Sequence, residues 1–196
     1  PEPLEDHPVR AVACALQMQA AMDEINFLNE AEGLPHLEMG IGVDTGQVVV
    51  GNIGSERKMD YTVIGNMVNV ASRLEGLTKV YKQELIVSES VVKYVEGRFP
   101  CRLIDRVVVK GKTSGIGIYV PRRELSDGEK EAWELHSKAV KLYYSRGFAE
   151  AAEAFQGVLR ILPQDQVAAM FLARCRSFQK TPPPAGWTGA EVMTEK

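Results

Sequence analysis

Apolar positions along the first fifty residues follow two different periods. Over residues 8–28 they recur every three or four positions, which predicts one amphipathic helix with Asp6 available as its cap. Over residues 37–43 apolar and polar residues alternate, which predicts a strand with one covered face. Turn residues at 44–46 and the run 47–50, QVVV, then predict a returning strand. We therefore expect a β-hairpin over residues 37–50.

The mixed pattern continues to about residue 120. Asn66 is a suitable cap for a helix that reaches about Lys79, with apolar residues at helical spacing along one side. The remaining pattern predicts strands over 85–87, 102–110 and 116–120 and a helix over 89–95. Strands and helices in this order predict an α+β domain.

The pattern becomes purely helical after Pro121. Ala, Glu, Leu and Lys at helical spacing predict three helices, over about 127–145, 148–161 and 165–179. Beyond them, the run 182–184 of three prolines is extended, and we expect Trp187 to pack back on the helices.

This helical segment resembles a tetratricopeptide repeat. The spacing is carried by Ala139, Phe148, Ala151, Phe155 and Pro163. Ala173 lies 34 positions after Ala139, where a second repeat would begin, although that repeat is incomplete and the glycine at 147 comes one place late. The alternative is a helical hairpin unrelated to any repeat family. If the resemblance holds, a protein partner for this segment is the expected consequence.

Composition restricts the class of protein. The 196 residues are 45% hydrophobic and 25% charged with a net charge of −3, which is typical of an ordinary soluble globular protein. The sequence has no apolar run of membrane-spanning length, no leader and no basic block, so we expect a cytoplasmic chain that contacts neither membrane nor nucleic acid. A parent protein with a membrane anchor upstream is compatible with this pattern. The three scattered cysteines suggest reduced thiols.

The most specific chemistry lies in the stretch from Gly40 to Arg73. Asn69 and Arg73 are four residues apart on the predicted helix and therefore project from one face, about 100° away from the apolar positions 70 and 74. A carboxamide beside a guanidinium can hold a sugar or a phosphate. On spacing alone, a solvated helix face remains the alternative.

The run 61–74, YTVIGNMVNVASRL, follows glycines at 42, 46, 51 and 54. Together with Val109-Lys110-Gly111-Lys112 it resembles the catalytic domain of the class III adenylate/guanylate cyclases, and the resemblance covers roughly residues 1–120. It implies a ferredoxin-like α/β sandwich. It also implies a reaction in which the 3′-hydroxyl of ATP attacks its own α-phosphate, giving 3′,5′-cyclic AMP and pyrophosphate, with two Mg²⁺ or Mn²⁺ ions.

Four positions match functional residues of that family. Asn69 matches the residue that orients the ribose, and Arg73 the one that stabilises charge on the α-phosphate. Lys110 matches the lysine that neutralises the terminal phosphates, and Thr62 the position that contacts the purine edge, as in a subgroup with many bacterial members. A hydroxyl both donates and accepts hydrogen bonds, so Thr62 leaves adenine and guanine open. Taken by themselves, Thr62 and Lys110 are also compatible with purely structural roles.

The family's two metal-binding aspartates belong upstream of the first predicted helix, so the resemblance predicts no metal ligand in this chain. Asp44 lies in the predicted turn, where the family has no ligand, and the three histidines, His7, His36 and His136, have no partner at ligand spacing. We expect a cyclase sandwich that lacks its N-terminal strands and helices. Its uncovered sheet would require non-native pairing, a swapped dimer or the missing segment in another form.

Three segments follow from this interpretation: a partial cyclase catalytic domain over 1–121, a tetratricopeptide-like segment over 127–180 and an extended tail over 181–196. Family active sites form between two catalytic domains, so a second cyclase domain, as in a homodimer, is the expected partner besides ATP. We expect adenylate cyclase activity in a full-length protein and none from this chain alone. The alternatives are a guanylate cyclase or a degenerate cyclase-like module that binds nucleotide or regulates a partner.

Overall fold

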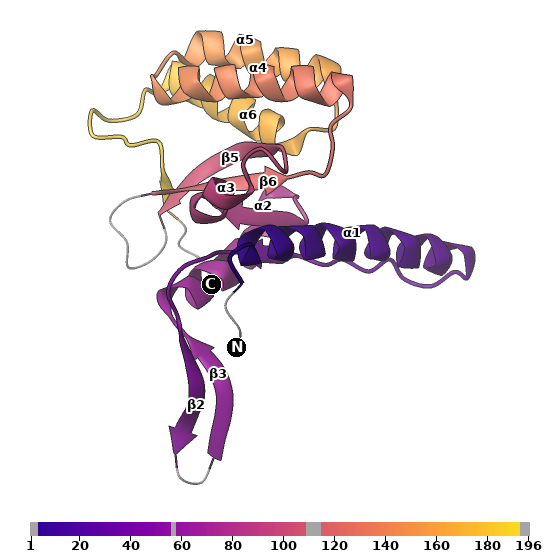
Figure 1. Ribbon diagram of the computed structural model, residues 1–196. Helices are drawn as coiled ribbons and strands as arrows, with labels where there is room; N and C mark the ends of the chain where they lie inside the picture. Colours follow the sequence, from indigo (N-terminus) through magenta and orange to yellow (C-terminus); the bar gives the residue numbers. More distant parts are fainter. Residues whose placement is uncertain (1–3, 56–57, 109–114, 193–196) are drawn as a thin grey trace. The chain divides into compact units, whose positions relative to one another are not determined.

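The computed structural model describes residues 4–55, 58–108 and 115–192, and its chain divides into two compact units, residues 1–98 with the last three residues, and residues 99–193 (Figure 1). The predicted domain boundary near residue 121 stays a prediction. The division into compact units places the strands just before residue 121 in the same unit as the helices after it. The elements of the first unit are α1 (His7–Ala31), β1 (Ile41–Val43), β2 (Val49–Ser55), β3 (Lys58–Ile64), α2 (Asn66–Tyr81), β4 (Leu85–Ser88) and α3 (Glu89–Val95).

The core of the first unit forms where α1 and α2 cover a short parallel strand pair. β1 pairs with β4 in parallel, from Ile41 opposite Leu85 to Val43 opposite Val87. β4 is buried along its whole length, as expected for a parallel strand covered on both faces. The two strands are joined through α2, which is the connection that parallel neighbours need.

The predicted hairpin over residues 37–50 is wrong. Of the expected first strand, only residues 41–43 form a strand. They pair with β4 and not with residues 47–50. The hairpin of this unit is formed by β2 and β3 instead, which pair antiparallel from Val49 opposite Ile64 to Ser55 opposite Lys58. Local alternation marks a strand but does not identify its partner, and here the partner of β1 lies beyond a helix.

The helix predicted over 8–28 is present as α1. It buries one face, with Val12, Ala15 and Leu16 as the main apolar contacts. Asp6 occupies the cap position without a side-chain cap and instead pairs with Arg10 at 2.9 Å. In Figure 1 the C-terminal half of α1 extends to the right with the returning segment beside it, and the Asn26 side chain holds that segment through both backbone groups of Leu37.

The second unit combines an antiparallel strand pair with three helices. Its elements are β5 (Cys101–Val108), β6 (Ile116–Pro121), α4 (Asp127–Tyr144), α5 (Phe148–Ile161), α6 (Gln166–Lys180) and β7 (Glu191–Val192). β5 pairs antiparallel with β6 and, at its last two residues, in parallel with β7. The helices occupy the predicted ranges, and the Ser126 side chain and Glu129 form a capping box at the start of α4.

The three helices close around an aromatic core. Trp187 packs on Tyr143, Phe148 and Phe178 with ring centroids 5.3 to 5.7 Å apart, so the expectation that it folds back on the helices is confirmed. Arg146 takes the left-handed turn position before Gly147, with φ of 69°, and donates hydrogen bonds to two proline carbonyls of the tail. The tail is thereby held on the helices by the Trp187 ring and by its proline carbonyls.

Candidate active site

A single glycine joins β3 to α2 and turns the chain from strand into helix. Gly65 is extended, with φ of 172°, and a Cβ atom added to it would lie 2.9 Å from Cγ1 of Val48. The prediction that Asn66 caps α2 is wrong, because Gly65 holds the cap position and Asn66 is the first helical residue. The close approach requires a residue without a side chain at the cap.

Helix α2 lies directly on β1 because two glycines leave room for it. A Cβ atom at Gly42 would lie 2.2 Å from the carbonyl oxygen of Ala71 and 2.4 Å from the backbone nitrogen of Glu75. A Cβ atom at Gly40 would lie 2.3 Å from Oγ1 of Thr78. The glycines of this motif therefore fix the position of α2 against the sheet.

The two sides of α2 carry different chemistry. Val70 and Leu74 are buried, whereas Asn69 and Arg73 are exposed. Because Asn69 and Arg73 are four residues apart in one regular helix, they lie on the same exposed side. The prediction that Asn69 and Arg73 share one face of the helix is therefore confirmed.

Thr62 belongs to the strand that leads into this helix. It lies in β3 opposite Gly51 and is exposed, as are all residues of β3. The structure thus puts Thr62, Asn69 and Arg73 on one continuous strand–glycine–helix segment. Lys110, the fourth predicted residue, lies outside the described residues.

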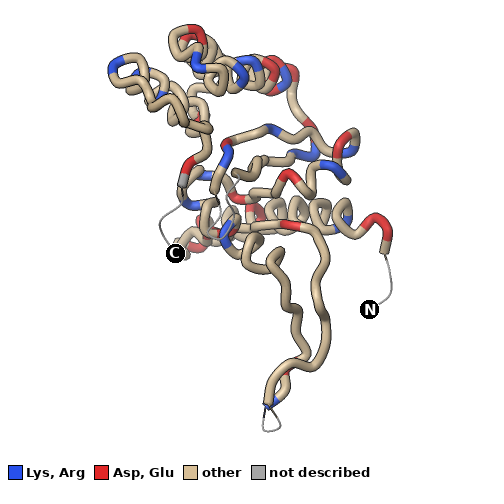
Figure 2. The backbone as a smooth tube through the Cα atoms, turned by 90° about the vertical axis from the view of Figure 1, so that its left-hand side faces the viewer, with Lys and Arg blue, Asp and Glu red and all other residues tan. Residues whose placement is uncertain are grey.

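The hairpin that carries Thr62 exposes apolar side chains. Val49 and Tyr61 are each 67% exposed, and Met59 and Ile64 are more than half exposed. Figure 2 shows charged residues near the tip of this hairpin and few along its arms. Exposed apolar side chains are thus concentrated on this hairpin.

The described residues contain no group of three or more His, Cys, Asp or Glu side chains able to hold a metal ion. The nearby carboxylates have other partners: the Ser88 hydroxyl donates a hydrogen bond to Asp44, and Asp60 lies 3.9 Å from the Lys58 ammonium. These residues therefore do not fit a divalent-ion site, and no chemical step can be assigned to an ion held by them. Nor does the part of the chain that the structure describes contain a helix long and apolar enough to cross a membrane.

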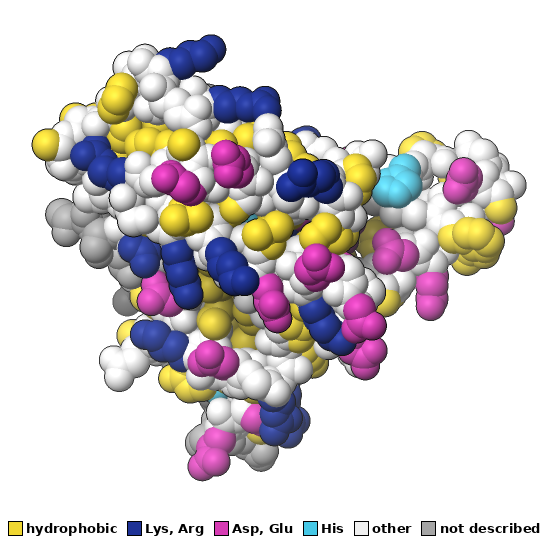
Figure 3. All heavy atoms as spheres, turned by 90° about the horizontal axis from the view of Figure 1, so that it is seen from above, with side chains coloured by type: hydrophobic (Ala, Val, Ile, Leu, Met, Phe, Trp, Pro, Cys, Tyr) yellow, Lys and Arg dark blue, Asp and Glu magenta, His cyan; other side chains and the backbone are white. Residues whose placement is uncertain are grey.

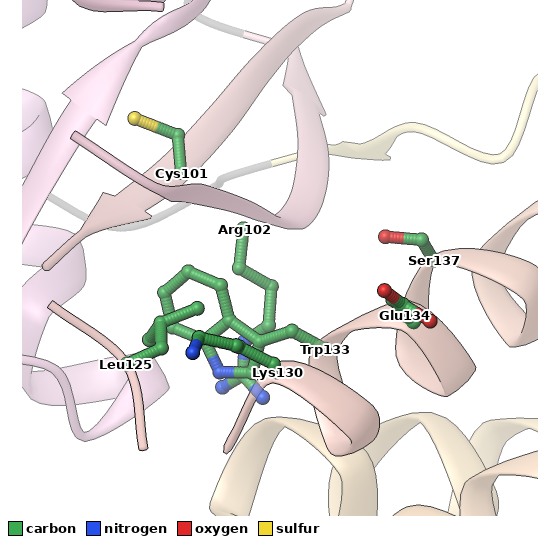
Figure 4. A pocket seen from close by; sticks show the side chains of 7 residues that line it. All are labelled: Cys101, Arg102, Leu125, Lys130, Trp133, Glu134 and Ser137. Carbon is green, nitrogen blue, oxygen red and sulfur yellow. The ribbon is translucent and has the colours of Figure 1, made fainter. Parts of the chain in front are cut away.

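The second unit contains a pocket of about 210 Å³ between β5 and the first turns of α4 (Figure 4). Arg102 lies over the Trp133 ring, 5.3 Å from its centroid, and Figure 4 shows Lys130 beside them. Arg102 is also ion-paired with buried Asp165, which neutralises its charge. The pocket is smaller than the roughly 300 Å³ at which small-molecule sites usually begin.

Sequence reasoning missed the buried polar groups of this unit. Asp105 on β5 is fully buried, and it accepts hydrogen bonds from Arg174 at 2.6 Å and from the Tyr144 hydroxyl at 3.2 Å. Burial and the Asp105 carboxylate raise the pKa of Tyr144. Burial, followed by the charge of Arg102, lowers the pKa of His136 to about 4, so the neutral ring donates from Nε2 to the Leu103 carbonyl at 2.9 Å. These groups stabilise the unit and do not line the candidate site.

Comparison with known sequence families identifies the class of protein. Residues 1–127 match the adenylate and guanylate cyclase catalytic domain, which is well over half of the chain. The chain therefore belongs to this family, and the predicted class III cyclase resemblance is confirmed.

Individual relatives agree with this assignment. The chain is 45% identical over 116 residues to an adenylate cyclase of Anabaena cylindrica, covering 56% of this chain and 23% of that protein. It is 29% identical over 184 residues to the terminal-differentiation-specific adenylate cyclase of Dictyostelium discoideum, covering 88% of this chain and 8% of that protein. This second match extends past residue 127 and so includes helical residues of the second unit. The chain spans less than a quarter of either relative.

Solved structures show the same fold. The guanylyl cyclase Cya2 superposes with a TM-score of 0.53 at 35% identity, covering 65% of this chain and 64% of that one. The adenylyl cyclase CyaB from P. aeruginosa superposes with a TM-score of 0.52 at 32% identity, covering 61% and 62%. The predicted α+β cyclase fold is thus confirmed at the level of its class.

Proposed function

We propose that this chain supplies the substrate-orienting side of an adenylate cyclase active site, which converts ATP to 3′,5′-cyclic AMP and pyrophosphate. The observation that carries the proposal is the exposed pair Asn69 and Arg73 on α2, a helix held on the sheet by Gly42. Family membership and the adenylate cyclase relatives support the same reaction.

In the proposed reaction the ribose 3′-hydroxyl loses its proton to water, its oxygen attacks the α-phosphorus, and the bond between that phosphorus and the oxygen of the leaving pyrophosphate breaks. The Asn69 carboxamide orients the ribose. The Arg73 guanidinium donates to the non-bridging oxygens of the α-phosphate as charge builds up there, a role for which a planar and permanently charged donor is suited. Thr62 contacts the purine edge and Lys110 the terminal phosphates.

The remaining half of the site belongs to a second cyclase domain in this proposal. By resemblance to the family, two Mg²⁺ or Mn²⁺ ions would be held by aspartates of that domain. The exposed apolar hairpin that carries Thr62 supports such a partner, because the other domain would cover it. The tetratricopeptide-like segment is part of the same proposal: Ala139, Ala151 and Phe155 are buried between helices, as the repeat requires.

Complementation tests the proposal. The chain would be mixed with the catalytic domain of a family adenylate cyclase whose own residues matching Asn69 and Arg73 have been changed to alanine, so that it contributes only the metal-binding side. Cyclic AMP should form from ATP and Mn²⁺ in the mixture and in neither component alone, and Asn69→Ala in this chain should abolish it. An inactive mixture at every ratio would contradict the proposal, and turnover by the chain alone would contradict the division of the site.

Guanylate cyclase activity is the second candidate, favoured by the likeness to a guanylyl cyclase structure at 35% identity and by the hydroxyl of Thr62. The same mixture supplied with ATP and GTP together distinguishes the two. Preferential formation of cyclic AMP supports the first candidate, and preferential formation of cyclic GMP supports the second.

A further inference from the structure

Gly51 on β2 is a glycine that the fold of its hairpin does not require. A Cβ atom added to it would meet nothing within 4 Å, and its φ does not lie in the left-handed region. The five other glycines between residues 40 and 65 would each bring an added Cβ atom within 3 Å of a neighbouring atom. Glycine inside a strand lowers stability, because it loses more conformational freedom on folding and has no side chain to pack. The missing side chain of Gly51 therefore needs a reason outside the packing of the hairpin.

The register of the hairpin puts Gly51 directly opposite Thr62. The pairing of β2 with β3 continues without a shift from Val49 opposite Ile64 to Ser55 opposite Lys58. Residues directly opposite each other in an antiparallel pair present their side chains on the same face. Gly51 therefore leaves a gap beside the Thr62 side chain, on the two-stranded arm that Figure 1 shows for β2 and β3.

Apolar side chains border this gap along the strands. Two residues away on the same face, Val49 and Ile64 form one neighbouring pair, and Ile53 belongs to the other. Val49 and Ile53 are four residues apart on β2, which is about 13 Å at roughly 3.3 Å per residue. The arms of the hairpin carry few charges in Figure 2, whereas the face in Figure 3 mixes charged with hydrophobic side chains. The gap thus has a flat backbone floor, apolar sides and one hydroxyl at its edge.

We propose that Gly51 is a further residue of the nucleotide site, where its missing side chain makes room for the purine ring. A flat ring with apolar faces and a polar edge matches the shape and chemistry of the gap. When the ring lies over the backbone of Gly51, its polar edge meets the Thr62 hydroxyl, which both donates and accepts hydrogen bonds. Gly51 supplies the space for the base, and Thr62 supplies the polar contact.

This inference rests on the proposed function, because it adds a residue to the same nucleotide site. It can be tested without unfolding the chain. A side chain added at Gly51 has open space around its Cβ atom, and β-branched residues are favoured in strands. Substitutions at this position are therefore expected to change the binding of the base and to leave the hairpin folded.

The KM for ATP in the complemented mixture tests the inference. With the partner domain at saturation, Gly51→Val should raise KM by about 5- to 150-fold, the range that corresponds to overpacking of a filled space. The kcat should stay near the wild-type value, because the added side chain opposes bound substrate and transition state alike. Asn52→Val is the matched control, since Asn52 is exposed, neighbours Gly51 on β2 and faces the other side of the hairpin opposite Tyr61. This control should leave KM near the wild-type value.

Inhibition by inorganic tripolyphosphate identifies what fills the gap, because this probe has the phosphates of ATP and no base. Its inhibition constant, and the partner concentration that gives half-maximal activity, should be the same for Gly51→Val and the wild type. An unchanged KM in Gly51→Val would overturn this inference and leave the proposed function standing. Weaker inhibition by tripolyphosphate, or a higher half-maximal partner concentration, would also overturn it, since the gap would then serve the phosphates or the partner domain. A wild-type mixture without turnover would instead contradict the proposed function, and this inference with it.

Discussion

Replacement of Gly42 by alanine tests how α2 is positioned. The added Cβ atom would lie 2.2 Å from the Ala71 carbonyl oxygen and 2.4 Å from the Glu75 nitrogen, whereas ordinary contacts begin near 3.4 Å. Both obstacles are backbone atoms, so no change of side-chain rotamer relieves the clash. The helix must shift by about 1 Å, and overpacking of this kind costs about 1–3 kcal/mol.

Gly76→Ala provides the matched control. Gly76 lies in the same helix, and a Cβ atom added there meets nothing within 4 Å. Alanine is favoured over glycine inside a helix by about 0.5–1 kcal/mol, so this variant should be stabilised. Both substitutions add one methyl group, but Gly42→Ala is expected to lower the stability of the fold and Gly76→Ala to raise it.

The assay is hydrogen exchange followed by mass spectrometry, read on peptides from α2 and β4. Gly42→Ala should accelerate exchange in α2 by about 5- to 150-fold, since each 1.4 kcal/mol of lost stability corresponds to a factor of ten in the opening equilibrium. Gly76→Ala should slow it. Equal exchange in the two variants, or a Gly42→Ala chain as protected as the wild type, would refute the argument that this glycine fixes the helix.

Three further predictions concern the second unit. The pKa of His136 is about 4 in the folded chain and 6.5 in the unfolded chain, so between these pH values only the unfolded chain takes up the proton. The free energy of unfolding should therefore fall by up to about 3 kcal/mol as the pH drops from 6.5 to 4. Urea unfolding of His136→Gln should show a smaller fall over the same pH range. Asp105→Asn removes the fully buried carboxylate that pairs with Arg174, which keeps Glu191 at 3.5 Å, and should cost about 1–3 kcal/mol in the same assay. Asp127→Asn, at a fully exposed carboxylate, should leave stability nearly unchanged. Trp187→Ala removes the ring that holds the tail on the helices, so limited proteolysis should cut residues 181–192 faster than in the wild type; unchanged cleavage would contradict that anchoring role.

Local pattern predicted helices well and strand partners poorly. The ranges of α4, α5 and α6 follow directly from helical spacing and from a capping residue such as Ser126. The partner of β1 could not be predicted in this way, because parallel pairing joins segments separated by a whole helix. The glycine at 42 was recognisable as part of a motif, but its role as a contact for the α2 backbone emerges only in three dimensions.

The buried charges were also beyond the reach of the sequence. Asp105 and Arg174 are 69 residues apart, and Arg102 and Asp165 are 63 apart, so no local spacing links either pair. By contrast, the shared face of Asn69 and Arg73 follows from helical geometry alone, and the structure contains it. Their roles in catalysis remain a proposal that rests on the family.

The most direct test of the central claim is the effect of Arg73→Ala on the kinetics of the complemented enzyme. If Arg73 stabilises charge that develops on the α-phosphate, kcat should fall by about 10²–10³-fold while KM for ATP changes little. Lys79→Ala, which removes another exposed cation from a different side of α2, should leave both constants near their wild-type values. An unchanged kcat in Arg73→Ala, or the same loss in Lys79→Ala, would contradict the account.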